Sequence, residues 1–490
     1  MICSFPLTKY ITKGNEMCNA IQLVIKEEKI IMSNNTDLEQ EIDQLYTVAE
    51  QAVQAFGQFN TEQVEKIVNA VAEAAADKAE FYAQWTVRET GYGNVPDKVG
   101  KNLATSIGLR DTYNVAEYVE PSVDFEKKII SIPKPAGVVL APMPCTNPIM
   151  SVNFNVLANL VTRNSVIMCP HPAAKECCTH AAHFLAEVAE KAGAPKGCIQ
   201  IMAEPNIALV NMLMKNPRTS LIMAIGGPGL VHAAYSSGNP AVGVGAGNVA
   251  VYVDTTADIE KAGADVVIGN SFDYGLPCTC ESVVLAERAI AAQLKSAMVV
   301  NGAWFAEGED NQKLRDFLFP DGVSNPAALG KSPQWIGENS AVSVPEDTKS
   351  IVMEISQLGR DEPVSKEKMF PLLGFFVVEG GADSAIEHAM SMLNMMGKGH
   401  SAVVHTTDPN VVVKYSLALP VCRIAVNTAG MTGNAGMTTN LAETGAVGTG
   451  FFGGSSTSEN IGPMHLVQHT KVAYDNDSSI QMGDIESALT

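Results

Sequence analysis

The sequence has little positive charge. Its 490 residues include 33 Lys and Arg against 53 Asp and Glu, which gives a net charge of −20. Binding to nucleic acid or to an anionic membrane depends on clustered Lys and Arg that displace counterions. We therefore expect neither nucleic acid nor a membrane as a partner, and we interpret the acidity as a well-solvated surface.

Disulfide and zinc patterns are also lacking. The ten cysteines show no disulfide-framework spacing, and no C-x-x-C pair occurs among them. Structural zinc sites are typically built from such pairs. We therefore expect no metal site, and a reducing, cytoplasmic location.

Long apolar runs are lacking too. No stretch reaches the roughly 18 consecutive apolar residues of a membrane span. Residues 1–32 do not show the order of charged, apolar and cleavage regions that marks a signal peptide. We expect these residues to form a peripheral N-terminal extension.

What the sequence does contain is an alternation of helices and strands. Residues 36–86 have helical periodicity, with a capping-box pattern at Asn60 or Thr61. Strand-like runs at 127–144 and 164–172 are followed by a helix ending at Gly193 and by further strand–helix pairs up to about residue 235. This order indicates an α/β fold with a mostly parallel, doubly wound sheet.

A second alternating lobe is expected from about residue 256 to 421. We expect the strand-like segment 423–430 to return to the first lobe. The Gly-, Thr- and Ser-rich stretch that follows is predicted to wrap a site, since it comes directly after a buried strand. Two interlocked lobes with a cleft between them are the expected architecture.

Several segments carry residue types suited to chemistry. Gly226, Gly227 and Gly229 stand between a strand and a helix, where backbone N–H groups bind phosphate. The pattern is not G-x-G-x-x-G, however, and it also suits an ordinary turn.

Asn147 follows a strand and is either an oxyanion donor or a turn former. His400, flanked by Gly397 and Gly399, is either a site residue or structural.

Cys278 and Cys280 lie one residue apart in "GLPCTCES". Joint metal ligation is sterically poor at this spacing, and a disulfide would close a small strained ring. One nucleophilic cysteine beside a spectator remains, as does the alternative of two buried packing residues.

Seven segments in order resemble the CoA-acylating branch of the aldehyde dehydrogenase superfamily. They are "CTNP", "TRNSVIMCPHPAAK", "GGPGLVHAAYSSGNPAVGVGAGN", "FDYGLPCTCES", "KEKMFP", "GKGHSAVVH" and "GGSSTSENIGPMHL". The resemblance covers about residues 38 to 475. It implies a Rossmann-type cofactor domain interlocked with a second α/β catalytic domain, and a small oligomerisation arm.

The resemblance also assigns roles. Phe272 and Glu281 frame Cys278 as the nucleophile, Asn147 matches the oxyanion-hole residue, and His400 matches a histidine near the acyl-transfer site. It also implies a binding site for NAD or NADP. The "PHP" segment contributes His171 and Pro172, and the acid of "KEKMFP" is Glu367. The glycine turn contributes Gly226, Gly227 and Gly229.

One departure from the wider superfamily bears on the acceptor. Hydrolytic members carry an E-L-G-G-K segment whose Glu activates water, whereas this chain has "VGAGN", with Val244 in the place of the acid. We therefore expect reversible, CoA-dependent oxidation of a small aldehyde to acyl-CoA through a cysteine thioester. The alternatives are a dehydrogenase that releases the free acid, and an inactive scaffold homologue.

The resemblance further implies domains, an assembly and a substrate range. We expect a cofactor domain over 33–255 plus 423–455 and a catalytic domain over 256–422. The arms 122–131 and 460–475 are expected to form a homodimer or homotetramer. Residues 429–449 are expected to line the aldehyde pocket, with their hydroxyls holding a polar group or with Phe451 and Phe452 forming an apolar wall. The expected substrates have two to four carbons, among them acetaldehyde and sulfoacetaldehyde, and we favour a small polar aldehyde such as sulfoacetaldehyde.

Overall fold

The computed structural model describes residues 38–477, 479 and 482–483. The chain divides into two compact units, Met1–Val48 and Ala49–Thr490. In the first unit, residues 38–48 are helical. The extension expected over residues 1–32 lies outside the described residues. All elements named below belong to the second unit.

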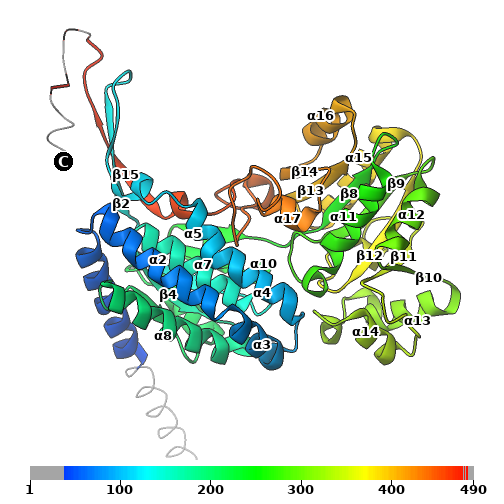
Figure 1. Ribbon diagram of the computed structural model, residues 1–490, viewed down its shortest axis with the longest axis horizontal. Helices are drawn as coiled ribbons and strands as arrows, with labels where there is room; N and C mark the ends of the chain where they lie inside the picture. The colour runs from blue at the N-terminus through cyan, green and yellow to red at the C-terminus, as the bar shows by residue number, and fades with distance from the viewer. Residues whose placement is uncertain (1–37, 478, 480–481, 484–490) are drawn as a thin grey trace, which may run out of the picture. The chain divides into compact units, whose positions relative to one another are not determined.

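A five-stranded parallel sheet follows the N-terminal helices (Figure 1). Its order is β5-β4-β3-β6-β7, with β3 (Val138–Pro142), β4 (Ser165–Cys169), β5 (Ile199–Ile201), β6 (Leu221–Ile225) and β7 (Ala241–Val244). The winding direction changes between β3 and β6, since β4 and β5 lie on one side of this point and β7 on the other. Ligands of open α/β sheets bind at the carboxyl ends of the strands at such a change.

Helices pack around this sheet. They are α2 (Thr61–Asp77), α3 (Ala79–Thr90), α4 (Val95–Leu103), α5 (Leu109–Thr112), α6 (Ala116–Val119), α7 (Pro148–Val161), α8 (Lys175–Ala192), α9 (Ile207–Lys215) and α10 (Pro228–Tyr235). The predicted capping box is confirmed, because Asn60 and Gln63 exchange side-chain and backbone hydrogen bonds. The predicted stop at Gly193 is confirmed too: this residue ends α8 at φ 117°, in the left-handed region that glycine enters without steric cost.

A seven-stranded parallel sheet forms the second lobe, in the order β10-β11-β12-β9-β8-β13-β14. Its strands are β8 (Val249–Val253), β9 (Glu281–Glu287), β10 (Ala303–Ala306), β11 (Ser350–Glu354), β12 (Leu372–Val378), β13 (Gly399–His405) and β14 (Val421–Val426). Along β9, Val283 and Leu285 enter one apolar core and Val284 and Ala286 another. Both faces of the sheet are therefore covered, as parallel sheets require.

The helices of this lobe are α11 (Ile259–Ser271), α12 (Ala291–Val300), α13 (Gly308–Leu318), α14 (Pro333–Ser340), α15 (Gly381–Met395), α16 (Pro409–Ala418) and α17 (Gly430–Asn434). The expected fold class, two α/β lobes with parallel sheets, is confirmed.

Two of the expected boundaries are wrong. The segment 423–430 does not return to the first sheet, because β14 pairs in parallel with β13 in the second. Likewise β8 pairs with β9 and β13, so the second lobe begins before residue 256. The physical reason is that β13, α16 and β14 form a short βαβ unit, whose strands pair as neighbours.

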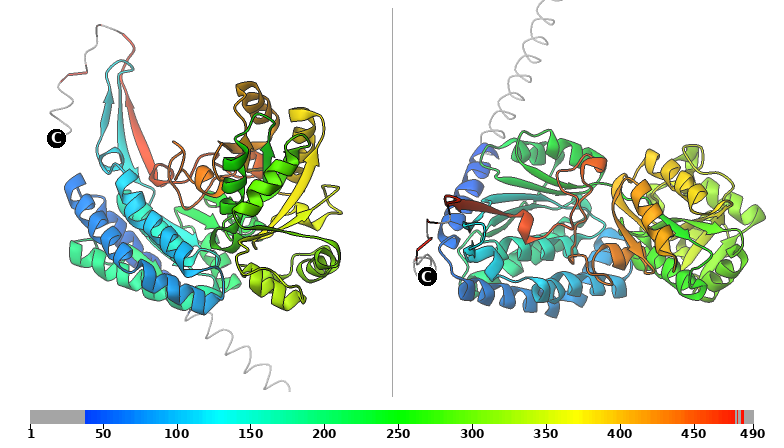
Figure 2. Two further views of the ribbon diagram at one scale, coloured as in Figure 1. Left: turned by 45° about the vertical axis from the view of Figure 1, so that its right-hand side comes forward. Right: turned by 90° about the horizontal axis from the view of Figure 1, so that it is seen from above.

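A third, antiparallel sheet has the order β1-β2-β15. Its strands are β1 (Ser122–Asp124), β2 (Ile129–Pro135) and β15 (Val467–Ala473). Figures 1 and 2 show β2 and β15 side by side, with Val467 opposite Pro135 and Ala473 opposite Ile129. The two segments expected to form an arm therefore pair with each other within the chain.

Among the residues that the structure describes, no helix combines the length and the apolar composition that crossing a membrane would require.

Candidate active site

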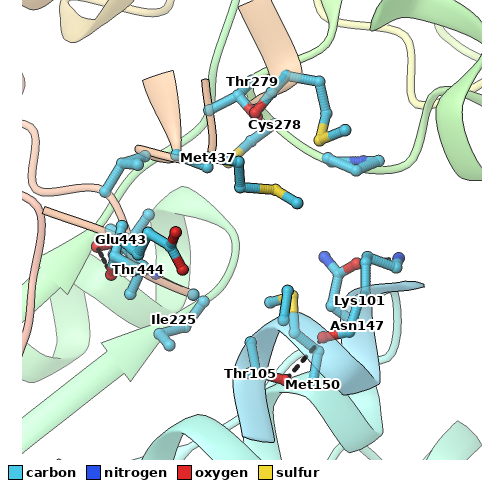
Figure 3. Close-up of a pocket in the computed structure, with 18 of the residues that line it drawn as sticks. Lys101, Thr105, Asn147, Met150, Ile225, Cys278, Thr279, Met437, Glu443 and Thr444 are labelled. Atoms are coloured by element: carbon cyan, nitrogen blue, oxygen red, sulfur yellow. Dashed lines mark hydrogen bonds between the residues drawn. The ribbon is translucent and has the colours of Figure 1, made fainter. Parts of the chain in front are cut away.

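Cys278 and Asn147 line one cavity of about 110 Å³ (Figure 3). Cys278 lies just before β9, at the amino edge of the seven-stranded sheet, and Asn147 lies just after β3, at the carboxyl edge of the five-stranded sheet. The cavity therefore joins two sheet edges, one from each lobe. Its remaining walls are mostly apolar and include Met150, Ile225 and Met437.

The Cys278 thiol lies in a low-dielectric environment. Burial and the nearby Glu367 carboxylate raise its pKa to about 12, and the positive charge of Arg423 opposes this shift. In the free protein the group is therefore a thiol at neutral pH, and it needs a proton acceptor before it can act as a nucleophile.

Cys280 has a different environment. It is absent from the cavity that Cys278 shares with Asn147, and its sulfur lies 4.0 Å from the carbonyl oxygen of Phe272. Burial and the neighbouring Glu281 carboxylate raise the pKa of Cys280 well above its ordinary value. Both cysteines line a second cavity of about 10 Å³, and Cys278 is the one that also lines the larger cavity.

Gly247 lies where three predicted site residues meet. Its N–H donates to the Glu367 carboxylate at 3.0 Å. A Cβ at this position would lie 2.0 Å from the carbonyl oxygen of Cys278 and 3.3 Å from Cε1 of His400. Only glycine leaves room for this approach. The structure therefore brings Cys278, Glu367 and His400 together around one backbone position.

His400 is fully buried at the start of β13. Its Nδ1 lies 2.8 Å from the Ser401 hydroxyl, while its Nε2 has no hydrogen-bond partner within the described residues. Arg423 donates to the His400 carbonyl oxygen at 2.9 Å. Burial and this positive charge lower the pKa of His400 to about 3, so the ring is neutral. A neutral ring with a free nitrogen can accept a hydrogen bond.

The predicted cofactor residues other than Glu367 lie at the carboxyl edge of the five-stranded sheet. Gly226 and Gly227 follow β6, and Gly227 is the N-cap of α10. A Cβ on Gly227 or on Gly229 would meet open space, so the turn leaves room for a ligand at the start of the helix. His171 and Pro172 follow β4, exposed, and the Nδ1 of His171 accepts a hydrogen bond from the Ala173 N–H at 3.1 Å.

The glycine-rich stretch after β14 lines the same cavity as Cys278. Met431, Met437 and the segment 443–447 all contribute to it. The alternative of an apolar wall made by Phe451 and Phe452 is wrong, since these side chains are 91% and 60% exposed and lie outside the lining.

Three functional candidates were missed from the sequence: Lys101, Asp273 and Glu443. Lys101 and Glu443 are the charged residues of the cavity lining, and Asp273 is the buried partner of Lys101. A signal existed for Lys101, because "NVPDKVGKN" places two lysines three apart on a capped helix. Nothing in the sequence indicates that Glu443, in a loop of small residues, faces the cavity.

Comparison with known proteins defines the family. The profile of the aldehyde dehydrogenase family matches residues 14–309. The bifunctional aldehyde-alcohol dehydrogenase of Escherichia coli is 36% identical over 439 residues, covering 88% of this chain and 49% of that protein. The chain thus spans about half the length of this relative. The acetylating succinate-semialdehyde dehydrogenase of Clostridium kluyveri is 34% identical, covering 91% of this chain and 97% of the relative.

Solved structures of aldehyde dehydrogenases are similar to this chain along most of its length. An acetylating aldehyde dehydrogenase from Geobacillus thermoglucosidasius has a TM-score of 0.86 and 35% identity, covering 91% of this chain and 99% of that one. A propionaldehyde dehydrogenase of Rhodopseudomonas palustris, solved with propionyl-CoA, has a TM-score of 0.80 and 27% identity, covering 88% of this chain and 94% of that one.

The chain belongs to the aldehyde dehydrogenase family. Within that family, the predicted resemblance to the acylating branch is confirmed by these relatives.

Proposed function

We propose that the protein is a nicotinamide-dependent, CoA-acylating aldehyde dehydrogenase with Cys278 as its nucleophile. The observation that carries this proposal is the shared cavity of Cys278 and Asn147, in which a thiol and a carboxamide from opposite lobes can meet one carbonyl group. The acylating relatives and the CoA-bound neighbour support it. In this proposal the five-stranded lobe binds the cofactor, the seven-stranded lobe supplies the nucleophile, and the β1-β2-β15 sheet is the oligomerisation arm.

In the proposed reaction, the Cys278 thiol first releases its proton to solvent. The resulting thiolate attacks the aldehyde carbon, forming the S–C bond and leaving the carbonyl oxygen as an oxyanion. The Asn147 carboxamide and the Cys278 N–H donate to that oxygen. A bound nicotinamide would supply the hydride acceptor needed to convert the thiohemiacetal to a thioester. His171, Pro172 and the glycine turn would hold the cofactor, with Glu367 on its nicotinamide ribose. All these roles are part of the proposal.

The acceptor step uses a second thiol. CoA, as thiolate, attacks the thioester carbon, and the Cys278–carbon bond breaks to release acyl-CoA and the Cys278 thiolate. We propose that Nε2 of His400, which is buried and without a partner among the described residues, accepts a hydrogen bond from the CoA thiol, whose proton then passes to solvent. Both partners of the exchange are thiolates, so the reverse reaction is open as well.

Val244 bears on water as an acceptor. It lines the cavity beside Cys278 and Asn147, and it is an apolar residue where hydrolytic relatives carry a base. A thioester persists without a base to activate water, and this persistence favours transfer to CoA over hydrolysis.

The charges of the cavity bear on the substrate. Among the described lining residues, Lys101 and Glu443 are the charged ones, and Lys101 is already paired with Asp273. The Glu443 carboxylate points into the cavity (Figure 3), and burial raises its pKa. An anionic aldehyde would be repelled by this carboxylate, whereas the Lys101 ammonium is held by Asp273 and by the carboxamide oxygen of Asn147. Of the substrates considered, we therefore propose an uncharged one such as acetaldehyde over sulfoacetaldehyde.

The test is NADH formation from acetaldehyde and NAD⁺, with and without CoA, in the parent protein and in Cys278→Ala and Cys280→Ala. The proposal requires turnover that depends on CoA and on Cys278 and that persists in Cys280→Ala. Undiminished turnover without CoA would establish the acid-releasing alternative. No turnover of any two- to four-carbon aldehyde with either nicotinamide cofactor would favour an inactive homologue.

A further inference from the structure

Asn147 occupies the N-cap position of α7 but does not use its side chain as a cap. Its backbone carbonyl oxygen accepts from the N–H of Ser151 at 3.0 Å and from the Ser151 hydroxyl at 2.7 Å. Asparagine at such a position usually caps the helix with its side-chain oxygen. Here that oxygen has another partner, and the side chain is turned towards the cavity instead.

The partner is Lys101. Its ammonium donates to the carboxamide oxygen of Asn147 at 2.6 Å. An ammonium has donors and no acceptor, so it fixes which end of the amide faces it. The Asn147 NH₂ group therefore points away from Lys101, and among the described residues its one hydrogen bond goes to the Thr146 hydroxyl at 3.3 Å. The NH₂ group, which must donate to an oxyanion, is therefore the end of the Asn147 amide that Lys101 leaves free.

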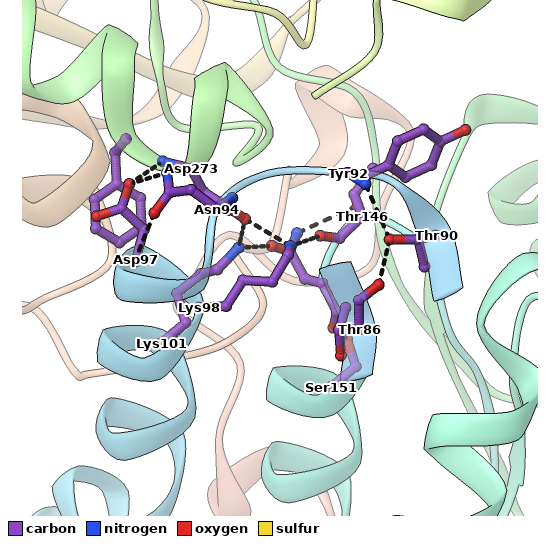
Figure 4. A network of polar contacts seen from close by, with 12 residues as sticks. Thr86, Thr90, Tyr92, Asn94, Asp97, Lys98, Lys101, Thr146, Ser151 and Asp273 are labelled. Carbon is purple, nitrogen blue, oxygen red and sulfur yellow. Dashed lines mark hydrogen bonds and ion pairs between the residues drawn. The ribbon is translucent and has the colours of Figure 1, made fainter. Parts of the chain in front are cut away.

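Lys101 is itself held by Asp273, 172 residues away in sequence (Figure 4). The Asp273 side chain is fully buried and also accepts from the Asn94 N–H at 2.9 Å and from the Lys98 ammonium at 2.9 Å. A Cβ on Gly93 would lie 2.0 Å from this carboxylate, so the chain before α4 is shaped to approach it.

Asp273 stands five residues before the nucleophile, in a turn that is unfavourable by itself. Asp273 and Tyr274 have φ angles of 48° and 56°, and each residue in this region costs on the order of 1 kcal/mol. The ion pairs from α4 hold this turn in place. One continuous set of contacts therefore runs from the Cys278 loop through Asp273 and Lys101 to Asn147.

Lys98 provides an internal comparison. It pairs with the same Asp273 carboxylate, but its other contact is the Thr146 carbonyl oxygen at 3.4 Å, and it does not reach the Asn147 amide. Burial and the charge of Lys101 lower the pKa of Lys98 to about 8. The two lysines thus share a structural ion pair and differ in their contact with the site.

We infer that Lys101 is a positioning residue of the oxyanion site. It orients the Asn147 carboxamide so that its NH₂ group faces the reacting oxygen, and its positive charge at the cavity wall favours the anion that develops there. Asp273 couples this arrangement to the loop that carries Cys278. The inference rests on the proposed role of Asn147 as the oxyanion donor.

The test is a double-mutant cycle on the full chain. Lys101→Met, Lys98→Met and Asn147→Ala are made singly, and each lysine variant is also combined with Asn147→Ala. Acetaldehyde oxidation gives kcat and KM, and iodoacetamide labelling of Cys278 reports whether the nucleophile loop is intact. Lys101→Gln, which keeps a donor without the charge, is the second variant if Lys101→Met does not fold.

The inference predicts that Asn147→Ala lowers kcat by about 100-fold or more, and that Lys101→Met lowers kcat by about 30-fold with little change in KM. It also predicts that Lys101→Met costs less than about threefold in the Asn147→Ala background, because the two residues act as one unit. Lys98→Met should lose less than about fivefold, while its melting temperature falls as in Lys101→Met.

Two results would overturn the inference: the same loss from Lys101→Met with and without Asn147, or an equal loss of kcat in the two lysine variants. Either result would mean that Lys101 acts only through its structural ion pair with Asp273. Full turnover in Asn147→Ala would instead contradict the proposed function itself.

Discussion

The N–H of Gly247 donates to the carboxylate of Glu367 at 3.0 Å, and Gly247 itself lies against the backbone of the nucleophile Cys278. A side chain on Gly247 would meet the Cys278 carbonyl oxygen at 2.0 Å. Gly247 therefore sets how closely Glu367 can approach the backbone of Cys278. It also makes the site sensitive to a single methyl group.

Gly247→Ala should lower kcat by about 100-fold or more, since displacing reacting groups by roughly 1 Å has that effect. Gly245→Ala is the matched control, because its Cβ would meet only Thr449, at 3.8 Å. Steady-state turnover of the two variants checks this expectation. Parental kcat in Gly247→Ala would show that the close approach to Cys278 is not required.

The reactivity of Cys278 should rise throughout the range from pH 7 to 9. Its pKa of about 12 keeps the group protonated there, so the thiolate fraction and the iodoacetamide labelling rate grow by about tenfold per pH unit. Glu367→Gln removes a negative charge that raises this pKa, so labelling should be faster at each pH. The measurement is made without cofactor. A plateau below pH 9, or slower labelling in the variant, would contradict this assignment.

Glu443→Gln should shift substrate preference towards anionic aldehydes. Losing the carboxylate removes the repulsion, so kcat/KM for succinate semialdehyde relative to acetaldehyde should rise by about tenfold, equivalent to about 1.4 kcal/mol. Glu443→Asp keeps the charge and serves as the control, with the parental ratio expected. If the ratio is the same in all three proteins, Glu443 does not select the substrate.

Val244→Glu should introduce NADH formation that needs no CoA. The new carboxylate would line the cavity beside Cys278 and could activate water against the thioester. Val244→Gln, of similar size but without a base, should stay dependent on CoA. Free acetate and acetyl-CoA are quantified in parallel. CoA-independent turnover in both variants would point to a loosened site instead of a base.

Glu281 should make stability depend on pH. Burial raises its pKa from 4.5 to about 8, although the Gly430 N–H bonded to its carboxylate opposes this. Between these values the folded state keeps a proton that the unfolded state has lost, so the free energy of unfolding falls as pH rises, by about 1.4 kcal/mol per unit. The melting temperature of Glu281→Gln, relative to that of the parent, should increase from pH 6 to pH 8. A difference that does not change with pH would mean that Glu281 is already ionised in the folded protein.

Local signals in the sequence predicted local structure well. The capping box at Asn60, the stop at Gly193 and the alternating strands and helices of both lobes depend on residues close in the chain. The cavity shared by Cys278 and Asn147 follows from their positions beside β9 and β3 once the fold is known.

Contacts between residues far apart in the chain could not be predicted from the sequence in the same way. The pairing of β14 with β13, rather than with the first sheet, depends on which edge is free after folding. The contact between Lys101 and Asp273 joins residues 172 positions apart, and no periodicity links them. The exposure of Phe451 shows the same limit, because hydrophobicity alone does not tell which apolar residues of a loop face a cavity.

The central claim is that Cys278 forms a thioester with the acyl group, and that this thioester persists until a thiol attacks it. The most direct measurement is peptide mass spectrometry of the protein after acetaldehyde and NAD⁺ are added without CoA, repeated after CoA is added. The account predicts one acetyl group on the peptide that contains Cys278, absent in Cys278→Ala, present in Cys280→Ala, and released as acetyl-CoA on addition of CoA. Acetylation that persists in Cys278→Ala, or free acetate formed at the same rate without CoA, would contradict it.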